Sequence, residues 1–197
     1  MPKNENKYKL VLASSSPRRE DILKQLRLRF TIVPGKIDES KFIEKDPEKL
    51  VKKLALEKAK SVSDLVEDAL IIAADTVVIC EDQILGKPED SQEAKEQLKL
   101  LRGKEHQVMT AVAVLSSDTG EVQVKNNITI VKMSNISDET IDKYINTGEP
   151  LDKAGSYGIQ GLGGLFVEGI KGSYYSVVGL PIHQLAEILD KFNYGIL

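Results

Sequence analysis

The sequence predicts an α/β fold in which a mixed β-sheet is flanked by helices. Short apolar runs with strand character alternate with segments of helical periodicity, and two pairs of apolar runs are joined by turns short enough for hairpins. Helices between strands favour parallel pairing, whereas hairpins impose antiparallel pairing, so the sheet is expected to be mixed. Such sheets usually bind ligands at the carboxyl ends of their strands, and functional residues are sought there.

The elements expected in the first half of the chain alternate between strands and helices. Ser16 and Asp46 stand at expected helix N-caps, and each is followed by a proline at the first helical position. The run Ala69–Cys80 is apolar apart from Asp75 and Thr76, as expected of a strand covered on both faces. The expected elements are strands over Lys9–Ala13, Phe30–Val33 and Ala69–Cys80, helices over Pro17–Arg27, from Pro47 to about Glu67 and over Ser91–Arg102, and a turn or hairpin over 81–90.

The second half is expected to contain two hairpins and two further helices. The first hairpin pairs 107–116 with 121–132, and the second spans 165–179, after the glycine-rich stretch 153–164. Ser137 is expected to cap a helix that ends before Gly148, and Pro181 to open a final amphipathic helix.

Composition excludes several classes of function. The formal net charge of −3 argues against a broad electrostatic footprint for duplex nucleic acid, and an aromatic content of 5 % argues against a stacking platform for single strands. No run of about 18 apolar residues occurs, so no membrane segment is expected, and the polar amino terminus does not resemble a signal peptide. We expect a cytoplasmic protein with no nucleic-acid or membrane partner.

The chain is long enough for a sizeable core. Its 197 residues, of which 41 % are hydrophobic, are expected to form a single domain over 1–197, as one body or as two lobes around a cleft. The lone cysteine, Cys80, excludes an internal disulfide and a multi-cysteine metal site, and its place at the end of an apolar run indicates a small buried hydrophobe. His106 and His183 lie in no metal-ligand spacing.

Two arginines stand in the first turn of the helix expected after Ser16. There the helix dipole favours anions, so Arg18 and Arg19 each cost about 0.3–1 kcal/mol in a bare helix. A bound phosphate reverses the sign, because backbone N–H groups, serine hydroxyls and guanidinium groups would converge on its oxygens. The alternative is that the arginines are solvated or pair with the two acidic residues that follow them.

Two charged residues fall on otherwise apolar surfaces. Lys58 lies on the apolar stripe of the helix from Pro47, so its ammonium must snorkel to solvent, the commoner outcome, or meet an anion. Asp75 interrupts an apolar strand, where an aspartate is costly unless a charged partner, a metal or a functional demand keeps it. Asp75 is a candidate general base or metal ligand, and a structural aspartate that caps a turn is the alternative.

Two further candidates lie in loops. Lys87 precedes Pro88 in a tight turn, a rigid place from which to present an ammonium group, although a plain surface lysine is the commoner case. Gln160 lies in the glycine-rich stretch and offers both a donor and an acceptor for the edge of a base, and the glycines permit close backbone approach to a ligand. A plain glycine-rich loop is the alternative.

The same segments resemble, in order, the blocks of the Maf family of nucleoside triphosphate pyrophosphatases: LASSSPRREDIL, ADTVV, LGKPED, DKAGSYGIQG and GSYYSVVGLPI. The resemblance extends from Leu10 to about Phe192. It implies an elongated mixed sheet with a cleft between two lobes, related to the inosine triphosphate pyrophosphatases. It also implies hydrolysis of a nucleoside triphosphate to the monophosphate and pyrophosphate with a divalent cation, Mg²⁺ or Mn²⁺.

The resemblance assigns roles to individual residues. It implies that Asp75 is the proton acceptor and that a metal ion binds at the acidic pair Asp38 and Glu39. Whether Asp75 acts as base or metal ligand, and which member of the pair binds the metal, stays open. The positions implied to bind the phosphates are Ser14, Arg18, Arg19, Lys58 and Lys87.

Three positions separate branches of the family. Arg18, Thr76 and Gln160 resemble the branch that hydrolyses dTTP and UTP, whereas the branch that acts on 7-methyl-GTP has Trp, Gln and Glu there. We expect such an enzyme to clear non-standard or excess nucleotides and to be linked to cell-division arrest. The alternatives are a pyrophosphatase for other modified nucleotides such as 7-methyl-GTP, or a nucleotide-binding regulator of septum formation. The resemblance is also compatible with a homodimer.

Overall fold

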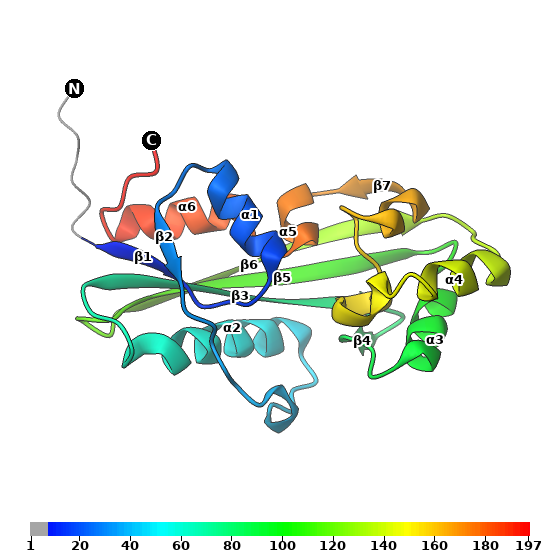
Figure 1. Cartoon of the computed structure of the whole chain (residues 1–197), viewed down its shortest axis with the longest axis horizontal. Coiled ribbons are helices and arrows are strands. Elements are labelled where there is room, and N and C mark those ends of the chain that lie inside the picture. The colour runs from blue at the N-terminus through cyan, green and yellow to red at the C-terminus, as the bar shows by residue number, and fades with distance from the viewer. Residues whose placement is uncertain (1–7) are drawn as a thin grey trace. The chain divides into compact units, whose positions relative to one another are not determined.

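The computed structural model describes residues 8–197, which form an open mixed sheet with flanking helices (Figure 1). Residues 1–7 lie outside the described residues. They include most of the polar amino terminus that does not resemble a signal peptide. The strand order is β2-β1-β3-β5-β6-β7, and β4 pairs with β3. The strands are β1 (Lys9–Leu12), β2 (Phe30–Ile32), β3 (Ala69–Cys80), β4 (Gln83–Leu85), β5 (Glu105–Ser116), β6 (Val122–Met133) and β7 (Val167–Lys171). The predicted α/β class is confirmed.

α1, α2 and α4 begin after the predicted caps Ser16, Asp46 and Ser137. Asp46 accepts hydrogen bonds from the N–H groups of Glu48 and Lys49, and the hydroxyl of Ser137 accepts one from the N–H of Thr140. The helices are α1 (Pro17–Gln25), α2 (Pro47–Ser63), α3 (Ser91–Leu101), α4 (Asp138–Ile145), α5 (Tyr174–Val178) and α6 (Ile182–Lys191). Short 3-10 turns cover Glu39–Lys41, Glu149–Asp152, Ala154–Ser156 and Leu162–Phe166.

Two helices end earlier than predicted. The helix expected to reach Arg27 stops at Gln25, because Arg27 adopts a left-handed backbone conformation with φ 56°. The helix expected to reach about Glu67 stops at Ser63, whose hydroxyl donates to the carbonyl of Lys60 at 2.8 Å. Serine hydroxyls that bond to the preceding turn weaken the helix there.

The second predicted hairpin, over 165–179, is wrong in its second half. The segment forms β7, which pairs antiparallel with β6, and then α5 in place of a returning strand. Ser173 explains the change, because its hydroxyl accepts from the N–H of Ser176 at 3.3 Å and so starts a helical turn. Its own N–H donates to the hydroxyl of Thr129 at 2.9 Å, which ties the start of α5 to β6.

The chain divides into two compact units. Of the described residues, the first unit comprises 8–75, 110–127 and 179–197, and the second comprises 76–109 and 128–178. β3, β5 and β6 each contribute residues to both units. The expectation of a single domain over 1–197 stays a prediction.

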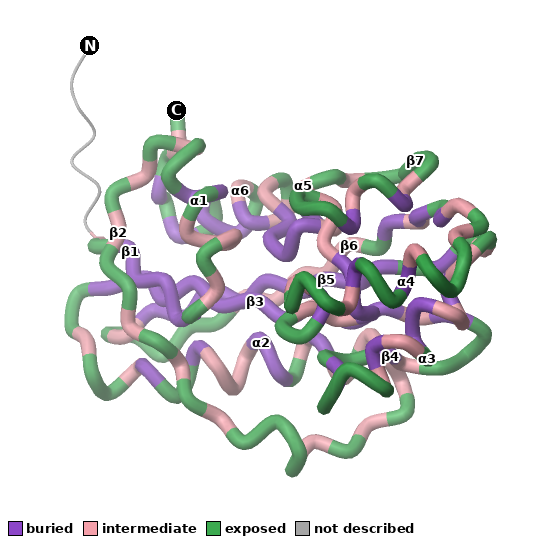
Figure 2. The backbone as a smooth tube through the Cα atoms, turned by 45° about the vertical axis from the view of Figure 1, so that its right-hand side comes forward, coloured by how far each residue is buried: buried purple, intermediate pink, exposed green. Residues whose placement is uncertain are grey.

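The first unit is built on parallel strands. Leu10 of β1 pairs with Phe30 of β2 on one side and with Leu70 of β3 on the other. α2 covers one face of these strands, and α1 and α6 cover the other (Figures 1 and 2). The run Ala69–Asp75 of β3 is therefore buried on both faces, as the continuous apolar sequence predicts.

The second unit has its own core. α3 packs against α4, and the predicted turn after β3 is a hairpin in which β4 pairs antiparallel with β3. Cys80 is 2 % exposed and belongs to this core, as predicted. The buried cluster comprises Val78, Cys80, Leu85, Leu98, Leu101, Val108, Val131, Met133, Ile141, Tyr144, Tyr157 and Phe166. Across residues 8–197, no helix combines the length and the apolar character needed to cross a membrane.

A buried histidine contacts this core. The Nε2 atom of His106 lies 2.7 Å from the hydroxyl of Tyr157, and the two rings meet edge to face with centroids 5.4 Å apart. Among the described residues, Nδ1 of His106 has no hydrogen-bond partner. Because protonation would place an unpaired charge in the core, burial lowers the pKa of His106 to about 4.

Acidification is expected to destabilise the protein through His106. The unfolded chain binds this proton near pH 6.5 and the folded chain only near pH 4, so its contribution to stability is complete above pH 6.5 and is lost as pH falls. We expect the free energy of unfolding to fall by about 3 kcal/mol from this group between pH 7 and pH 4. Urea unfolding at a series of pH values measures the loss.

Two variants isolate this contribution. His106→Gln is expected to flatten the fall in stability between pH 6.5 and pH 4, whereas His183→Gln, at a histidine whose side chain is 78 % exposed, should leave it unchanged. A His106→Gln variant that loses stability as steeply as the native chain would contradict the assignment.

Candidate active site

Ser14 lies in the turn between β1 and α1, and its side chain forms hydrogen bonds within that region. The side chain of Ser14 is buried, and its hydroxyl accepts hydrogen bonds from the N–H of Ser16 at 3.1 Å and from Nη1 of Arg19 at 3.4 Å. Ser16 occupies the N-cap of α1 as predicted, but its side chain makes no capping hydrogen bond. The start of α1 is thus organised by Ser14 and Arg19.

Arg19 is held by the backbone of a distant segment. Its Nε donates to the carbonyl of Gly179 at 2.8 Å. Burial lowers the pKa of the Arg19 guanidinium. The charge of Asp75 acts in the opposite direction but does not outweigh burial. Glu20 pairs instead with Lys24 at 2.6 Å. For Arg19, the alternative of a solvated side chain is therefore wrong.

The ammonium group of Lys58 pairs with two carboxylates and does not snorkel to solvent. Its side chain is 14 % exposed, and Nζ lies 2.5 Å from Oδ1 of Asp75 and 2.8 Å from Oε1 of Glu39. The apolar stripe of α2 directs Lys58 inward, because Ala55, Ala59 and Val62 on the same face are fully buried. One ammonium group therefore joins carboxylates from β3 and from the loop before α2.

Asp75 has the electrostatics expected of a functional carboxylate. Its side chain is 8 % exposed. Burial raises its pKa, while the charge and hydrogen bond of Lys58 and the charge of Arg19 act in the opposite direction. The result is a fixed carboxylate with a higher proton affinity than one in water, and it does not cap a turn.

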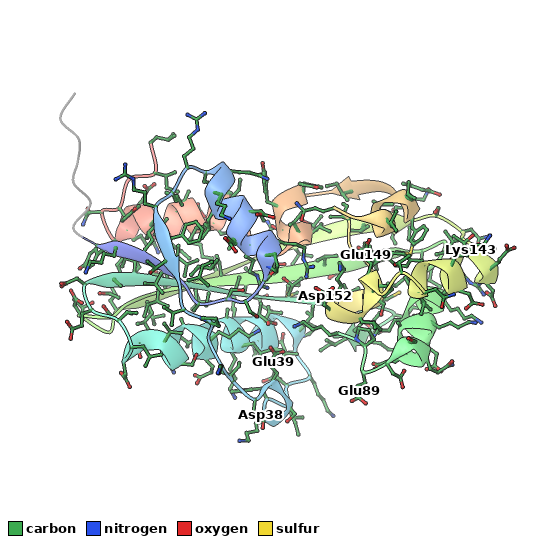
Figure 3. The ribbon with its side chains drawn as sticks, in the orientation of Figure 1. Asp38, Glu39, Glu89, Lys143, Glu149 and Asp152 are labelled. Carbon is green, nitrogen blue, oxygen red and sulfur yellow. The ribbon has the colours of Figure 1, made fainter. Side chains whose placement is uncertain are left out.

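The structure separates the two acidic residues predicted to bind metal. Glu39 joins the cluster through Lys58, whereas Asp38 is exposed, accepts a hydrogen bond from the hydroxyl of Ser40 at 2.6 Å and lies 3.5 Å from Nζ of Lys41 (both acidic residues are labelled in Figure 3). Within the described part of the chain, no group of three or more His, Cys, Asp or Glu residues is placed to hold a metal.

The sequence profile of a family described as "Maf-like protein" matches residues 9–192. This chain belongs to the Maf family. It is 48% identical to a dTTP/UTP pyrophosphatase of Alkaliphilus metalliredigens over 96% of this chain and 99% of that protein. It is 46% identical to a dTTP/UTP pyrophosphatase of Ruminiclostridium cellulolyticum over 95% of this chain and 98% of that protein. The solved Ham1 protein of Staphylococcus aureus aligns at TM-score 0.45 and 12% identity over 64% of this chain and 72% of that one.

Of the remaining predicted site residues of this Maf-family chain, Arg18 lies in the first turn of α1 in the first unit, and Thr76, Lys87 and Gln160 belong to the second unit. Thr76 is half-buried and follows Asp75 directly in β3. Lys87 is exposed in the turn between β4 and α3, and Gln160 is exposed in the loop that follows Tyr157. Within the first unit, Arg19 bonds to Ser14, Lys58 pairs with Asp75 and Glu39, and the charge of Arg19 acts on Asp75. The roles predicted for all of these residues, and for Lys87 and Gln160, stay predictions.

The glycine-rich stretch has an explanation within the chain itself. A Cβ atom on Gly161 would lie 2.4 Å from Oε1 of Glu149, and one on Gly163 would lie 2.6 Å from the hydroxyl of Tyr144. Larger residues cannot approach so closely, so these glycines accommodate the protein's own side chains. Neither Glu149 nor Tyr144 is among the predicted site residues, although Glu149 stands just before the DKAGSYGIQG motif.

Removal of the Lys58 ammonium is expected to destabilise the first unit in a pH-dependent manner. Lys58→Met leaves the buried carboxylate of Asp75 without this ion pair, which costs about 3 kcal/mol of unfolding free energy at pH 8. Without Lys58, the pKa of Asp75 in the folded chain rises further above its value in the unfolded chain. The loss of unfolding free energy therefore grows as pH rises through the folded-state pKa, and it is smaller at pH 5 than at pH 8. Chemical denaturation at both pH values measures the difference.

A matched surface lysine provides the control. Lys60 lies on the same helix, its side chain is 52% exposed, and it pairs with Glu57. Lys60→Met should change stability by less than about 0.5 kcal/mol at either pH. An equal loss at pH 5 and pH 8 in Lys58→Met would show that packing, and not the Asp75 charge, explains the effect.

Proposed function

We propose that this Maf-family chain hydrolyses nucleoside triphosphates, in particular dTTP and UTP, to the monophosphate and pyrophosphate. The observation that carries the proposal is the ion pair of Lys58 with the buried carboxylate of Asp75, on which the charge of Arg19 also acts. The relatives that match nearly the whole chain are named dTTP/UTP pyrophosphatases, which supports the choice of substrate.

The phosphate chain is assigned to the start of α1. Arg18 and Arg19 stand in its first turn, where the helix dipole and backbone N–H groups favour anionic oxygens. The hydroxyl of Ser14 lies at the same turn, and Lys58 adds a further cation. The family resemblance also implies that Lys87 binds phosphate.

The carboxylate of Asp75 is assigned the proton transfer. A water oxygen forms a bond to the α-phosphorus, its proton passes to Asp75, and the bond between the α-phosphorus and the oxygen leading to the β-phosphate breaks. The raised pKa of Asp75 suits it to accept this proton. Lys58 and the arginines stabilise the charge that develops on the departing pyrophosphate.

A divalent cation fits the oxygen donors of the cluster. Glu39 and Asp75 share Lys58, and Mg²⁺ typically binds one or two protein carboxylates together with substrate phosphates and waters. We therefore assign Mg²⁺ or Mn²⁺ to Glu39 together with the substrate phosphates, and give Asp38 no direct part. When bound, the ion would neutralise charge on the triphosphate.

Selection of the base is assigned to Gln160, with Arg18 and Thr76 as the other positions of the dTTP and UTP branch. Gln160 is exposed, and its amide offers one donor and one acceptor group to a pyrimidine edge. A site that hydrogen-bonds a particular edge rejects a base that cannot form those bonds, because a polar group would be left unpaired.

A nucleotide panel tests the reaction. With Mg²⁺, the chain is expected to release pyrophosphate from UTP and dTTP far faster than from 7-methyl-GTP or inosine triphosphate, and chelation of the cation should remove the activity. Asp75→Asn should lower kcat/KM by about 10²–10⁴-fold because the amide cannot accept the proton. Asp190→Asn, at an exposed aspartate of α6, serves as the control. Release of orthophosphate alone would overturn the reaction.

A single substitution tests base selection. Gln160→Glu replaces an amide donor by a second acceptor, so we expect kcat/KM for UTP to fall at least about tenfold. The midpoint of thermal unfolding should stay unchanged, since Gln160 is exposed. Steady-state kinetics with UTP measure the effect, and an unaltered turnover of UTP would remove Gln160 from base recognition.

A further inference from the structure

The carboxylate of Glu149 is the acceptor of three converging hydrogen bonds. It accepts from the N–H of Leu162 at 2.9 Å, from the N–H of Gly163 at 3.1 Å and from the hydroxyl of Tyr144 at 2.9 Å. Glu149, labelled in Figure 3, stands in the 3-10 turn that follows α4. One carboxylate therefore links this turn to the end of the loop that carries Gln160.

The start of the same loop is held from the same side. The hydroxyl of Tyr144 accepts a hydrogen bond from the N–H of Gly158 at 3.3 Å. The ring of Tyr144 is fixed by the core, because it meets the ring of Phe166 edge to face with centroids 5.0 Å apart. Tyr144 and Glu149 thus hold both ends of the segment 158–163, and Gln160 lies between these anchors.

The hydrogen-bond donors around Glu149 stabilise its ionised carboxylate. Burial raises the pKa of its carboxyl, but the hydrogen bonds from Gly163, Leu162 and Tyr144 outweigh burial and lower it overall. The ionised form is thus favoured, and it accepts hydrogen bonds at both oxygens. The side chain of Lys153, 14% exposed, donates to the backbone carbonyl of Glu149 at 2.7 Å and fixes the turn itself.

We infer that Glu149 is a positioning residue for substrate selection, which acts by holding the loop of Gln160 through Leu162 and Gly163. This inference rests on the proposed function, because it assigns Glu149 an effect on the nucleotide that Gln160 selects. A glutamine that reads a base edge must present its amide at a fixed position, which a loosely held loop cannot do.

Glu149→Gln removes the anchor with little change of shape. In one amide orientation the new N–H group faces the N–H of Leu162, and in the other it faces the N–H of Gly163, so one hydrogen bond is replaced by two opposed donors. We expect KM for UTP to rise about tenfold with a smaller change in kcat. The inhibition constant of inorganic triphosphate, which has no base, should stay unchanged.

Two variants distinguish positioning from a general structural role. Glu139→Gln changes an exposed glutamate of α4 that pairs with Lys143, and it should leave all constants unchanged. Tyr144→Phe keeps the ring contact with Phe166 but removes the hydroxyl that bonds to Glu149 and Gly158, so it should raise KM for UTP in the same direction.

A double-mutant cycle tests whether Glu149 acts through Gln160. In a Gln160→Ala background, Glu149→Gln should no longer raise KM for UTP, because the group that it positions is absent. A tenfold rise that persists in this background, or an unchanged KM in Glu149→Gln and Tyr144→Phe, would overturn the inference. If the native chain releases no pyrophosphate from UTP, the proposed function itself fails, which is a separate outcome.

Discussion

The ion pair between Lys58 and Asp75 is the interaction on which the candidate site depends. A carboxylate inside an apolar strand covered on both faces would be too costly without a cation at contact distance, and α2 supplies that cation from its apolar stripe. The same ammonium group draws Glu39 toward Asp75 from a loop that otherwise faces solvent. The side chain of Lys58 therefore stabilises the negative charge of Asp75 in β3 and also holds the carboxylate of Glu39 nearby.

Both units contain ion pairs, but the candidate site and the loop of Gln160 are held by different kinds of polar contact. In the first unit, charged side chains pair with one another and with backbone carbonyls from distant parts of the chain. In the second unit, the carboxylate of Glu149 accepts hydrogen bonds from two backbone N–H groups and from the hydroxyl of Tyr144, whose ring belongs to an aromatic pair in the core. The first arrangement suits the binding of a charged ligand and proton transfer, and the second suits the fixing of a loop.

Local signals made most of the fold predictable. Asp46 and Ser137 mark helix starts through their own side chains, and the continuous apolar run of Ala69–Cys80 gives the strand without error. The helix α5 was missed because its start depends on Thr129, which lies far from it in sequence. Of the site, Asp75 and Lys58 were found as charges in apolar patterns. The carbonyl of Gly179 could not be found, because a backbone acceptor has no sequence signature.

The bond from Arg19 to the carbonyl of Gly179 has a consequence for the order in which the protein acquires its structure. The partners are 160 positions apart, and the first unit is assembled from both ends of the chain and from a segment in the middle. A ribosome must synthesise nearly the whole chain before Gly179 and α6 can join the first unit. The parts of the second unit, 76–109 and 128–178, are made before that final piece. The bond between Arg19 and Gly179 therefore forms only in the last stage of synthesis, and a prematurely terminated chain lacks this partner.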